Sequence, residues 1–454
     1  MKENQRSIWN ECDDTRHTSL CIPTRRKNIY SIKKMDSLQN RGNTQQMNHA
    51  ILQKNINISK YHSDIDDDWT ESSDNTNYRL YDPKIQKIMI FNKFQSASYQ
   101  PADFLQLISS DVSKNLISTK NYEVIMALAK KFPGKLTSFF GFESRLTTDN
   151  STSDFLFAIS SNGGEKEQLM EFFQNKENSF LNKNIWTQIY NFTVEWLNPQ
   201  SIVSRNVLGI WLEFDTSENN FSNMIPSVYM HTTNINSKSE FRWLTTKALP
   251  LLLGNNLNEK ITKKLMECFC KLPKNSAVFQ VGAMLSRGVD GVRIVIKRID
   301  VDEILPYLQS IGWNDDSNKL GDLLEELKKY VNRFVLHLHV TENVHLKIGL
   351  ECSFYQDEPD QEKKWNNLFK FLQSKGLCIA EKYDALMDFP GVMLKDSESV
   401  FNFDEYSPIS VLQKNPSQSA LYRFISHVKI NYTPNQPVDA KAYCGVRLLG
   451  SDST

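Results

Sequence analysis

Residues 333–354 read RFVLHLHVTENVHLKIGLECSF, and the alternation of side chains in this stretch decides the fold. Two runs of strand-forming residues, 333–340 and 345–354, are joined by the polar turn Thr341-Glu342-Asn343, which is the pattern of a β-hairpin. Alternate side chains of a strand point to opposite faces, so each run has an aliphatic face and a polar face. The polar face carries His337, His339, His345, Lys347, Gly349, Glu351 and Ser353.

Four more strand pairs have the same arrangement. They are 138–147 with 154–160, 207–216 with 226–233, 277–285 with 292–299, and 426–432 with 440–448. The polar faces of the last two pairs carry Arg293, Lys297, His427, Lys429, Asn431, Lys441, Tyr443, Gly445 and Arg447. Five hairpins of this kind predict about ten strands, with one face aliphatic and the other largely polar.

Helices are predicted between the strand pairs. Apolar residues recur three and four positions apart in 165–174, 258–272, 320–331 and 362–375. Asn258 suits a helix N-cap, and Gly312 and Gly376 suit the position just after a helix. Both glycines lie in similar hexapeptides, LQSIGW at 308–313 and LQSKGL at 372–377, which indicates an internal repeat of roughly sixty to seventy residues.

Two architectures fit these elements. An antiparallel sheet can bury its aliphatic face and leave its polar face in water. Alternatively, the strands close into a barrel with a polar lumen and helices packed on the aliphatic outer face. The apolar stripe of each helix needs a sheet face, and closure removes exposed strand edges, so the barrel is favoured. We therefore expect an α+β fold: an antiparallel barrel of about ten strands, built from repeated helix–hairpin–helix units with the helices outside.

The composition limits the class of protein. The chain has 454 residues, with 53 basic and 53 acidic side chains, and this balance gives no footprint for binding nucleic acid. Seven irregularly spaced cysteines predict free thiols in a reducing compartment. The N-terminal residues lack the apolar core of a signal peptide. The sequence also contains no run of about 18 apolar residues, so no membrane span is predicted. A cytoplasmic location is expected.

The first part of the chain differs from the rest. Residues 1–82 are rich in Asn, Gln, Ser, Lys and Asp, with few clustered aliphatic residues. Such a segment buries too little apolar surface to offset its ordering entropy. We predict a disordered or loosely attached extension over 1–82 and a single barrel-like domain over 83–454.

The order of elements and the polarity of the strands resemble those of the ABBA-type aromatic prenyltransferases over about 114–449. That family has a ten-stranded antiparallel barrel in which lumen Arg, Lys and Tyr side chains hold an isoprenoid diphosphate. Lys441-Ala442-Tyr443 matches its recurrent Lys-x-Tyr pattern, and the strand at 292–299 resembles another basic wall. The candidate substrate-binding residues are Arg145, Arg293, Lys297, Lys347, Lys429, Lys441, Tyr443 and Arg447. The alternative is that these side chains lie on solvated strand faces.

Prenyl transfer to an aromatic ring also needs a carboxylate that accepts a proton. Glu351 is the first candidate, because Lys347 shares its strand face, and Glu213 is the second. A structural ion pair is the equally weighted alternative for Glu351. Mg²⁺ is left open as a cofactor for the diphosphate.

The polar strand faces also carry histidines that could ligate a metal. His337, His339 and His345 are weak candidates, because His-x-His on a strand places both rings on one side. The alternative is hydrogen bonding within a polar lumen. The sequence contains neither a phosphate-binding loop nor a Gly-x-Ser-x-Gly elbow.

Three functions remain. The first is a transferase that prenylates an aromatic small molecule or peptide side chain, with an isoprenoid diphosphate as its other partner. The second is a non-catalytic accessory or binding protein of natural-product or peptide maturation with the same barrel. The third is an interaction protein whose polar strand faces are only solvated. The oligomeric state stays open.

Overall fold

The computed structural model describes residues 88–91, 100–175, 184–216, 225–235, 238–288, 290–315, 318–355, 360–395 and 419–450. The predicted extension over 1–82 lies outside these residues, so the domain boundary near residue 82 stays a prediction. Within the described residues, no helix combines the length and the apolar character needed to cross a membrane.

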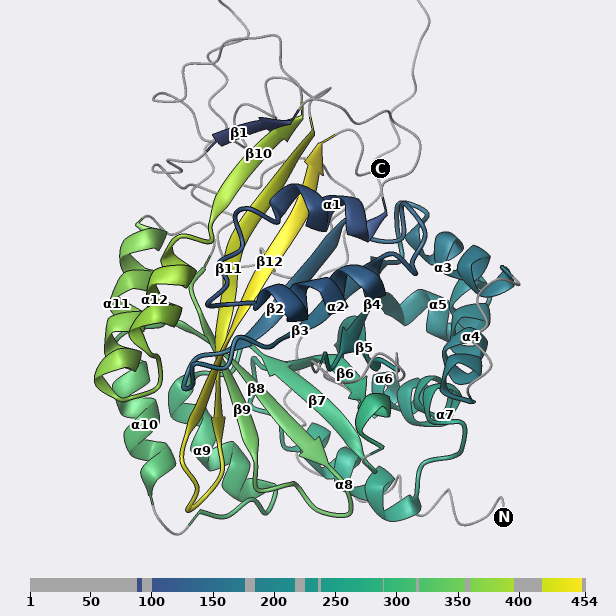
Figure 1. The fold of residues 1–454 in the computed structure, drawn as a ribbon. Coiled ribbons are helices and arrows are strands. Elements are labelled where there is room, and N and C mark those ends of the chain that lie inside the picture. The colour runs from purple at the N-terminus through teal and green to yellow at the C-terminus, as the bar shows by residue number, and fades with distance from the viewer. Residues whose placement is uncertain are drawn as a thin grey trace, which may run out of the picture. The chain divides into compact units, whose positions relative to one another are not determined.

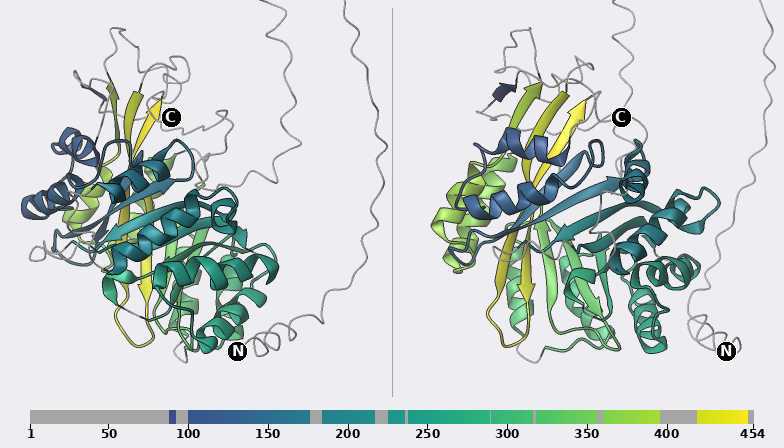
Figure 2. Two further views of the ribbon diagram at one scale, coloured as in Figure 1. Left: turned by 90° about the vertical axis from the view of Figure 1, so that its right-hand side faces the viewer. Right: turned by 45° about the vertical axis from the view of Figure 1, so that its right-hand side comes forward.

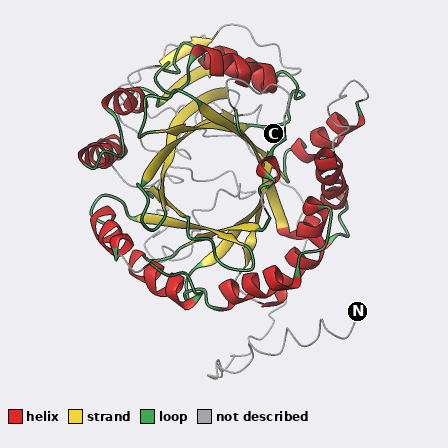
Figure 3. Ribbon diagram, turned by 60° about the horizontal axis from the view of Figure 1, so that its bottom comes forward, coloured by secondary structure: helices red, strands yellow, loops and turns green. Residues whose placement is uncertain are grey.

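Ten antiparallel strands close into a barrel (Figure 3). Their order around the barrel is β11, β12, β2, β3, β4, β5, β6, β7, β8 and β9, and a pairing between β9 and β11 closes the ring. The strands are β2 (Phe139–Arg145), β3 (Ser153–Ser160), β4 (Val207–Phe214), β5 (Ser227–Ile235), β6 (Ala277–Ala283), β7 (Val292–Lys297), β8 (Arg333–Val340), β9 (Ile348–Ser353), β11 (Ser419–Tyr432) and β12 (Asp439–Gly450). The predicted α+β barrel and its five hairpins are confirmed.

Strand β11 has two partners along the same edge. Residues 420–423 pair with β10 (Gly391–Lys395), and residues 428–432 pair with β9. A bulge between Ile425 and His427 separates the two halves. On the other side of β10, β1 (Ile88–Phe91) pairs with it in parallel. Together β10, β11 and β12 extend beyond the ring of helices (Figures 1 and 2). The sequence analysis found neither β10 nor β1, and it began the β11 strand at residue 426 rather than at Ser419.

Helices cover the outside of the barrel (Figures 1 and 3). Four of them confirm the predicted positions: α3 (Glu165–Gln174), α8 (Glu259–Cys270), α10 (Lys319–Leu327) and α11 (Gln361–Ser374). The others are α1 (Pro101–Ile108), α2 (Thr119–Ala129), α4 (Asn184–Leu197), α5 (Ile202–Asn206), α6 (Lys238–Trp243), α7 (Leu249–Leu253), α9 (Val301–Ser310) and α12 (Ala380–Met387), with a π-helical turn at Leu244–Ala248 and a 3₁₀ turn at Leu285–Arg287.

The main core lies between these helices and the outer face of the strands. Phe140 and Phe142 of β2 and Phe155 and Phe157 of β3 are almost fully buried there. Phe132, which follows α2, packs edge-on against Phe157 at a centroid distance of 4.8 Å. Burial of so many aromatic side chains fixes the register of the strands, because a shift by one residue would turn them into the lumen.

The two similar hexapeptides close their helices in the same way. After α9, Trp313 N–H donates to the Leu308 carbonyl at 3.0 Å, and after α11, Leu377 N–H donates to the Leu372 carbonyl at 2.8 Å. Gly312 and Gly376 have φ of 77° and 69°, a left-handed conformation that favours glycine. The repeated sequence is therefore a repeated helix end.

The antiparallel order places all five hairpin turns at one end of the barrel. We call this the turn end, and the opposite end, where the helical connections join the strands, the helix end. A residue's position along its strand then gives its depth. Arg293, near the start of β7, lies toward the turn end, and Lys297, at the end of β7, lies at the helix end.

Candidate functional site

The strand register brings the polar side chains together on the lumen side. Lys429 of β11 pairs with Glu351 of β9 on one side and with Lys441 of β12 on the other. Lys441 pairs in turn with Arg145 of β2. Residues paired across neighbouring strands lie on the same face, so these side chains share the lumen side of the barrel.

Glu351 lies in a buried chain of polar contacts. Its Oε1 is 2.5 Å from His337 Nε2 and 3.4 Å from His427 Nε2. The other ring nitrogen of His337, Nδ1, accepts from Lys429 Nζ at 3.1 Å. Burial alone would raise the pKa of Glu351, but His427, His337 and Lys429 outweigh it and hold that pKa well below its usual range. Glu351 is therefore an ionised residue with fixed partners.

Glu143 of β2 forms a second buried group. Its carboxylate accepts hydrogen bonds from the Lys441 ammonium and the Tyr443 hydroxyl. Although burial opposes it, Lys441 and Lys429 lower the pKa of Glu143 to about 2. The Tyr443 ring stacks on His427 at a centroid distance of 4.2 Å and so connects this group to the Glu351 group.

Four carboxylates gather on three neighbouring strands and just beyond the end of one of them. We name Glu143, Asp154, Glu213 and Asp215 the acidic wall. Arg287, from the 3₁₀ turn after β6, reaches this wall and pairs with Glu213 at 3.1 Å and with Asp215 at 2.6 Å. Burial and then the charge of Glu143 raise the pKa of Glu213, while burial and the other three carboxylates raise the pKa of Asp154 to about 8.

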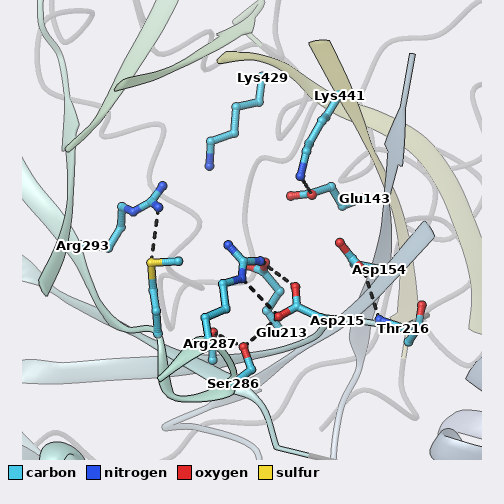
Figure 4. Close-up of polar contacts among 12 residues, drawn as sticks. Glu143, Asp154, Glu213, Asp215, Thr216, Ser286, Arg287, Arg293, Lys429 and Lys441 are labelled. Atoms are coloured by element: carbon cyan, nitrogen blue, oxygen red, sulfur yellow. Dashed lines mark hydrogen bonds and ion pairs between the residues drawn. The ribbon is translucent and has the colours of Figure 1, made fainter. Parts of the chain in front are cut away.

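Cations face this wall from other strands. Arg293 of β7 and Lys429 of β11, which we name the basic wall, point toward the same part of the lumen as Glu213, Arg287 and Lys441 (Figure 4). Arg293 Nη2 contacts the Met284 sulfur at 3.3 Å, and its buried Nε has no hydrogen-bond partner among the described residues. Burial and then Arg293 lower the pKa of Lys429 to about 8. Neither cation of the basic wall has a hydrogen-bonded carboxylate partner in the described part of the chain.

The raised pKa of Asp154 gives a stability prediction. Its pKa lies above the ordinary value of 3.8, so the contribution of Asp154 to the free energy of unfolding is highest at low pH and falls as pH rises toward 8. We expect Asp154→Asn to raise the unfolding free energy by about 1–3 kcal/mol at pH 8 and to change it little near pH 4. Asn keeps the acceptor for Thr216 N–H, now 3.0 Å from Asp154 Oδ1. Urea unfolding at both pH values tests this, and an equal effect at both would contradict it.

The remaining predicted residues lie away from these contacts. Arg145 and Lys347 are exposed at the turn end. Lys297 is buried at the helix end, 5.3 Å from the centroid of the Phe279 ring, and Arg447 also lies toward the helix end, paired with Phe139. Of the eight predicted substrate-binding residues, the structure brings together Arg293, Lys429, Lys441 and Tyr443.

The histidines proposed as metal ligands have other partners or positions. His337 lies between Glu351 and Lys429, and His339 Nε2 lies 3.0 Å from the Asp290 carbonyl. His345 is exposed. Among the described residues, no three His, Cys, Asp or Glu side chains are arranged to hold a metal ion. The histidines that are buried act through hydrogen bonds in this structure.

Sequence reasoning missed three residues of the site. Asp154 lies on the lumen face of β3 together with Leu156 and Ala158. Phe155 and Phe157 lie on the outer face of the same strand, and this alternation is visible in the sequence. Asp215 and Arg287 lie outside the regular strands. Their contact joins positions 72 residues apart, and no local pattern indicates it.

The closed strand order, the outer helices and the polar lumen define an ABBA-type barrel. Among solved structures, the chain is similar to the prenyltransferase PriB (10% identity, 76% of this chain and 96% of that one, TM-score 0.45) and to AnaPT from Neosartorya fischeri (11%, 78% and 93%, 0.44). It is also similar to 6-dimethylallyltryptophan synthase from Micromonospora olivasterospora (10%, 67% and 80%, 0.40). No family model and no curated protein matches the sequence. Because these TM-scores are below 0.5, the fold assignment rests on the strand pairing itself.

Proposed function

We propose that this protein is a transferase that prenylates an aromatic small molecule or peptide side chain from an allylic diphosphate bound in the lumen. One observation carries the proposal: inside a closed barrel, two cations that have no hydrogen-bonded carboxylate partner among the described residues face a wall of carboxylates (Figure 4). A diphosphate needs converging cations, and the aromatic acceptor needs a proton acceptor on its other side.

Arg293 and Lys429 are the proposed diphosphate ligands. The guanidinium of Arg293 offers several donors in a plane, which suits two phosphate oxygens at once. Lys429 donates to a neutral imidazole nitrogen, so its charge is available to an anion. In the proposed step, the allylic C–O bond breaks, its electron pair leaves with the diphosphate, and an aromatic carbon bonds to the allylic carbon.

Glu213 is the proposed proton acceptor for the ring carbon. Its raised pKa makes it a better base than Glu351, whose pKa is depressed and which already has fixed partners. Arg287 beside Glu213 keeps the carboxylate oriented. This assignment reverses the order in which the sequence analysis ranked the two carboxylates. Mg²⁺ as a partner of the diphosphate stays a proposal.

The test is product formation by the purified full chain. Dimethylallyl or geranyl diphosphate is supplied with tryptophan, tyrosine or aromatic peptides, with and without Mg²⁺, and products are detected by mass spectrometry. Glu213→Gln is expected to lower turnover about 10²- to 10⁴-fold. Glu325→Gln, which removes an exposed carboxylate on α10, is the matched control and should leave turnover unchanged.

A non-catalytic binding protein is the second candidate, and a specific observation favours it. Glu143 and Glu351, the two carboxylates that attract the Lys429 ammonium most strongly, are both held by cationic or imidazole partners. A lumen whose acids are neutralised internally can hold an anion without any proton transfer. Binding of the diphosphates without any product would select this function. We also propose a cytoplasmic location, which the buried free thiols of Cys268, Cys352, Cys378 and Cys444 support.

A further inference from the structure

Lys429 reaches its histidine partner across a glycine. It lies on β11, His337 lies on β8, and β9 runs between them with Gly349 opposite His337. A Cβ atom at Gly349 would lie 2.7 Å from Lys429 Cε and 3.2 Å from His337 Cβ. The missing side chain therefore lets the lysine stem cross a whole strand and place its Nζ 3.1 Å from His337 Nδ1.

The two contacts of His337 fix its protonation. The Lys429 ammonium can only donate, so Nδ1 must accept and carries no proton. Nε2 then carries the proton and donates to the Glu351 carboxylate. Burial and the charge of Lys429 lower the pKa of His337 to about 3, which agrees with a neutral ring. Glu351, His337 and Lys429 thus form a directed chain that ends in an ammonium on the lumen side.

We propose that Glu351 and His337 are positioning residues that hold the Lys429 ammonium where it binds the anionic group of the substrate. The gap at Gly349 lets the lysine side chain reach His337. The nature of that anion, an allylic diphosphate, rests on the proposed function. The chain of contacts itself does not depend on it. Glu351 acts here through His337 and touches no substrate.

The charged groups around Lys429 determine how its affinity for an anion depends on pH. Arg293 of β7 repels the ammonium, whereas Glu351 of β9, Glu143 of β2 and Glu213 of β4 attract it. Neutral His337 accepts its proton, and the Tyr443 ring lies 5.8 Å from Nζ. The pKa of Lys429 is about 8, below its ordinary value of 10.5, so the ammonium is lost as pH rises through about 8. Affinity for an anion should fall over the same range.

The experiment measures binding of dimethylallyl diphosphate to the full chain by calorimetry from pH 7.5 to 9.5. The terminal phosphate, with a pKa of about 6, is fully ionised over this range. Wild-type affinity is expected to fall at least about tenfold, since each pH unit above a pKa lowers the protonated fraction about tenfold. Glu351→Gln removes an attractive charge, so the pH at which affinity falls should move down by about one unit.

Gly349→Ala leaves every ionisable group in place, displaces Lys429 and adds a tight contact to His337 Cβ. We expect it to weaken binding about tenfold or more at pH 7.5, on the scale of one lost charge-assisted hydrogen bond. Gly321→Ala on α10 is the matched control, because its Cβ meets only Leu305 at an ordinary 3.7 Å. Thermal melts of all variants show which ones are folded. If Gly349→Ala does not fold, the isosteric Glu351→Gln decides the question.

The outcomes distinguish a failure of the proposed function from a failure of the positioning role. Absence of diphosphate binding by the wild-type chain overturns the proposed function. Wild-type binding together with folded variants that keep both the affinity and the pH profile overturns the positioning role and leaves the proposed function standing. Weaker binding by Gly349→Ala with a shifted profile for Glu351→Gln supports the inference.

Discussion

Replacing Arg293 with methionine is expected to weaken binding of dimethylallyl diphosphate at least about 30-fold and to lower any prenyl transfer with it. Its guanidinium is the cation of the basic wall best suited to a bidentate contact with phosphate, and within the described part of the chain it has a sulfur contact but no bonded carboxylate. Losing a largely desolvated charge contact of this kind costs about 2–5 kcal/mol, or roughly 30- to 4,000-fold in affinity.

Methionine keeps much of the unbranched length of the side chain, so the neighbouring strands keep their packing. Arg205→Met, on the exposed side of α5 outside the barrel, removes the same charge from the chain and should leave affinity unchanged. Calorimetry with the two variants side by side gives the comparison. Equal affinities would mean that the diphosphate does not contact the basic wall.

Asp111→Ala is expected to lower the free energy of unfolding by about 3–5 kcal/mol, the largest stability loss that we predict. Asp111 lies between α1 and α2 and pairs with Arg423 of β11, and both side chains are almost fully buried. Arg423 also donates through Nε to the Phe389 carbonyl at 3.1 Å, just before β10. Removing the carboxylate leaves an uncompensated buried guanidinium.

Asp302→Ala provides the contrast in a urea titration. Asp302 pairs with Lys328 at 3.4 Å, but its side chain is 77% exposed, and such pairs contribute about 0–1 kcal/mol. A double variant, Asp111→Leu with Arg423→Met, should recover much of the stability because it also removes the buried charge of Arg423. A loss below about 1 kcal/mol for Asp111→Ala would show that water reaches Arg423 in the folded protein.

The strands and their faces were predictable because the period of two is a local property. Five hairpins followed from alternation such as that in residues 333–354, and the barrel followed from the need to cover the aliphatic face with helices. The short β10 strand at Gly391–Lys395 was missed, since five residues give little alternation to read. The double pairing of β11 depends on tertiary contacts and has no local signal.

The site was only partly predictable, because alternation gives the face of a residue but not its depth. Lys441 and Arg447 share the lumen face of β12, yet six residues of strand separate them by about 20 Å. The sequence analysis therefore grouped Lys297 and Arg447 with residues near the other end of the barrel. It also ranked Glu351 above Glu213, because the pairing of Glu351 with His337 and of Glu213 with Arg287 depends on the closed barrel.

The closure of the ring by β11 and β12 has a consequence for synthesis on the ribosome. The hairpin at residues 419–450 supplies the partner of both β2 and β9, the first and last strands of the preceding eight. Until this hairpin leaves the exit tunnel, the nascent chain has two unpaired strand edges, which can recruit other chains. A polypeptide that terminates before Ser419 should therefore aggregate or be degraded, whereas one that ends just after Gly450 has all ten strands of the barrel.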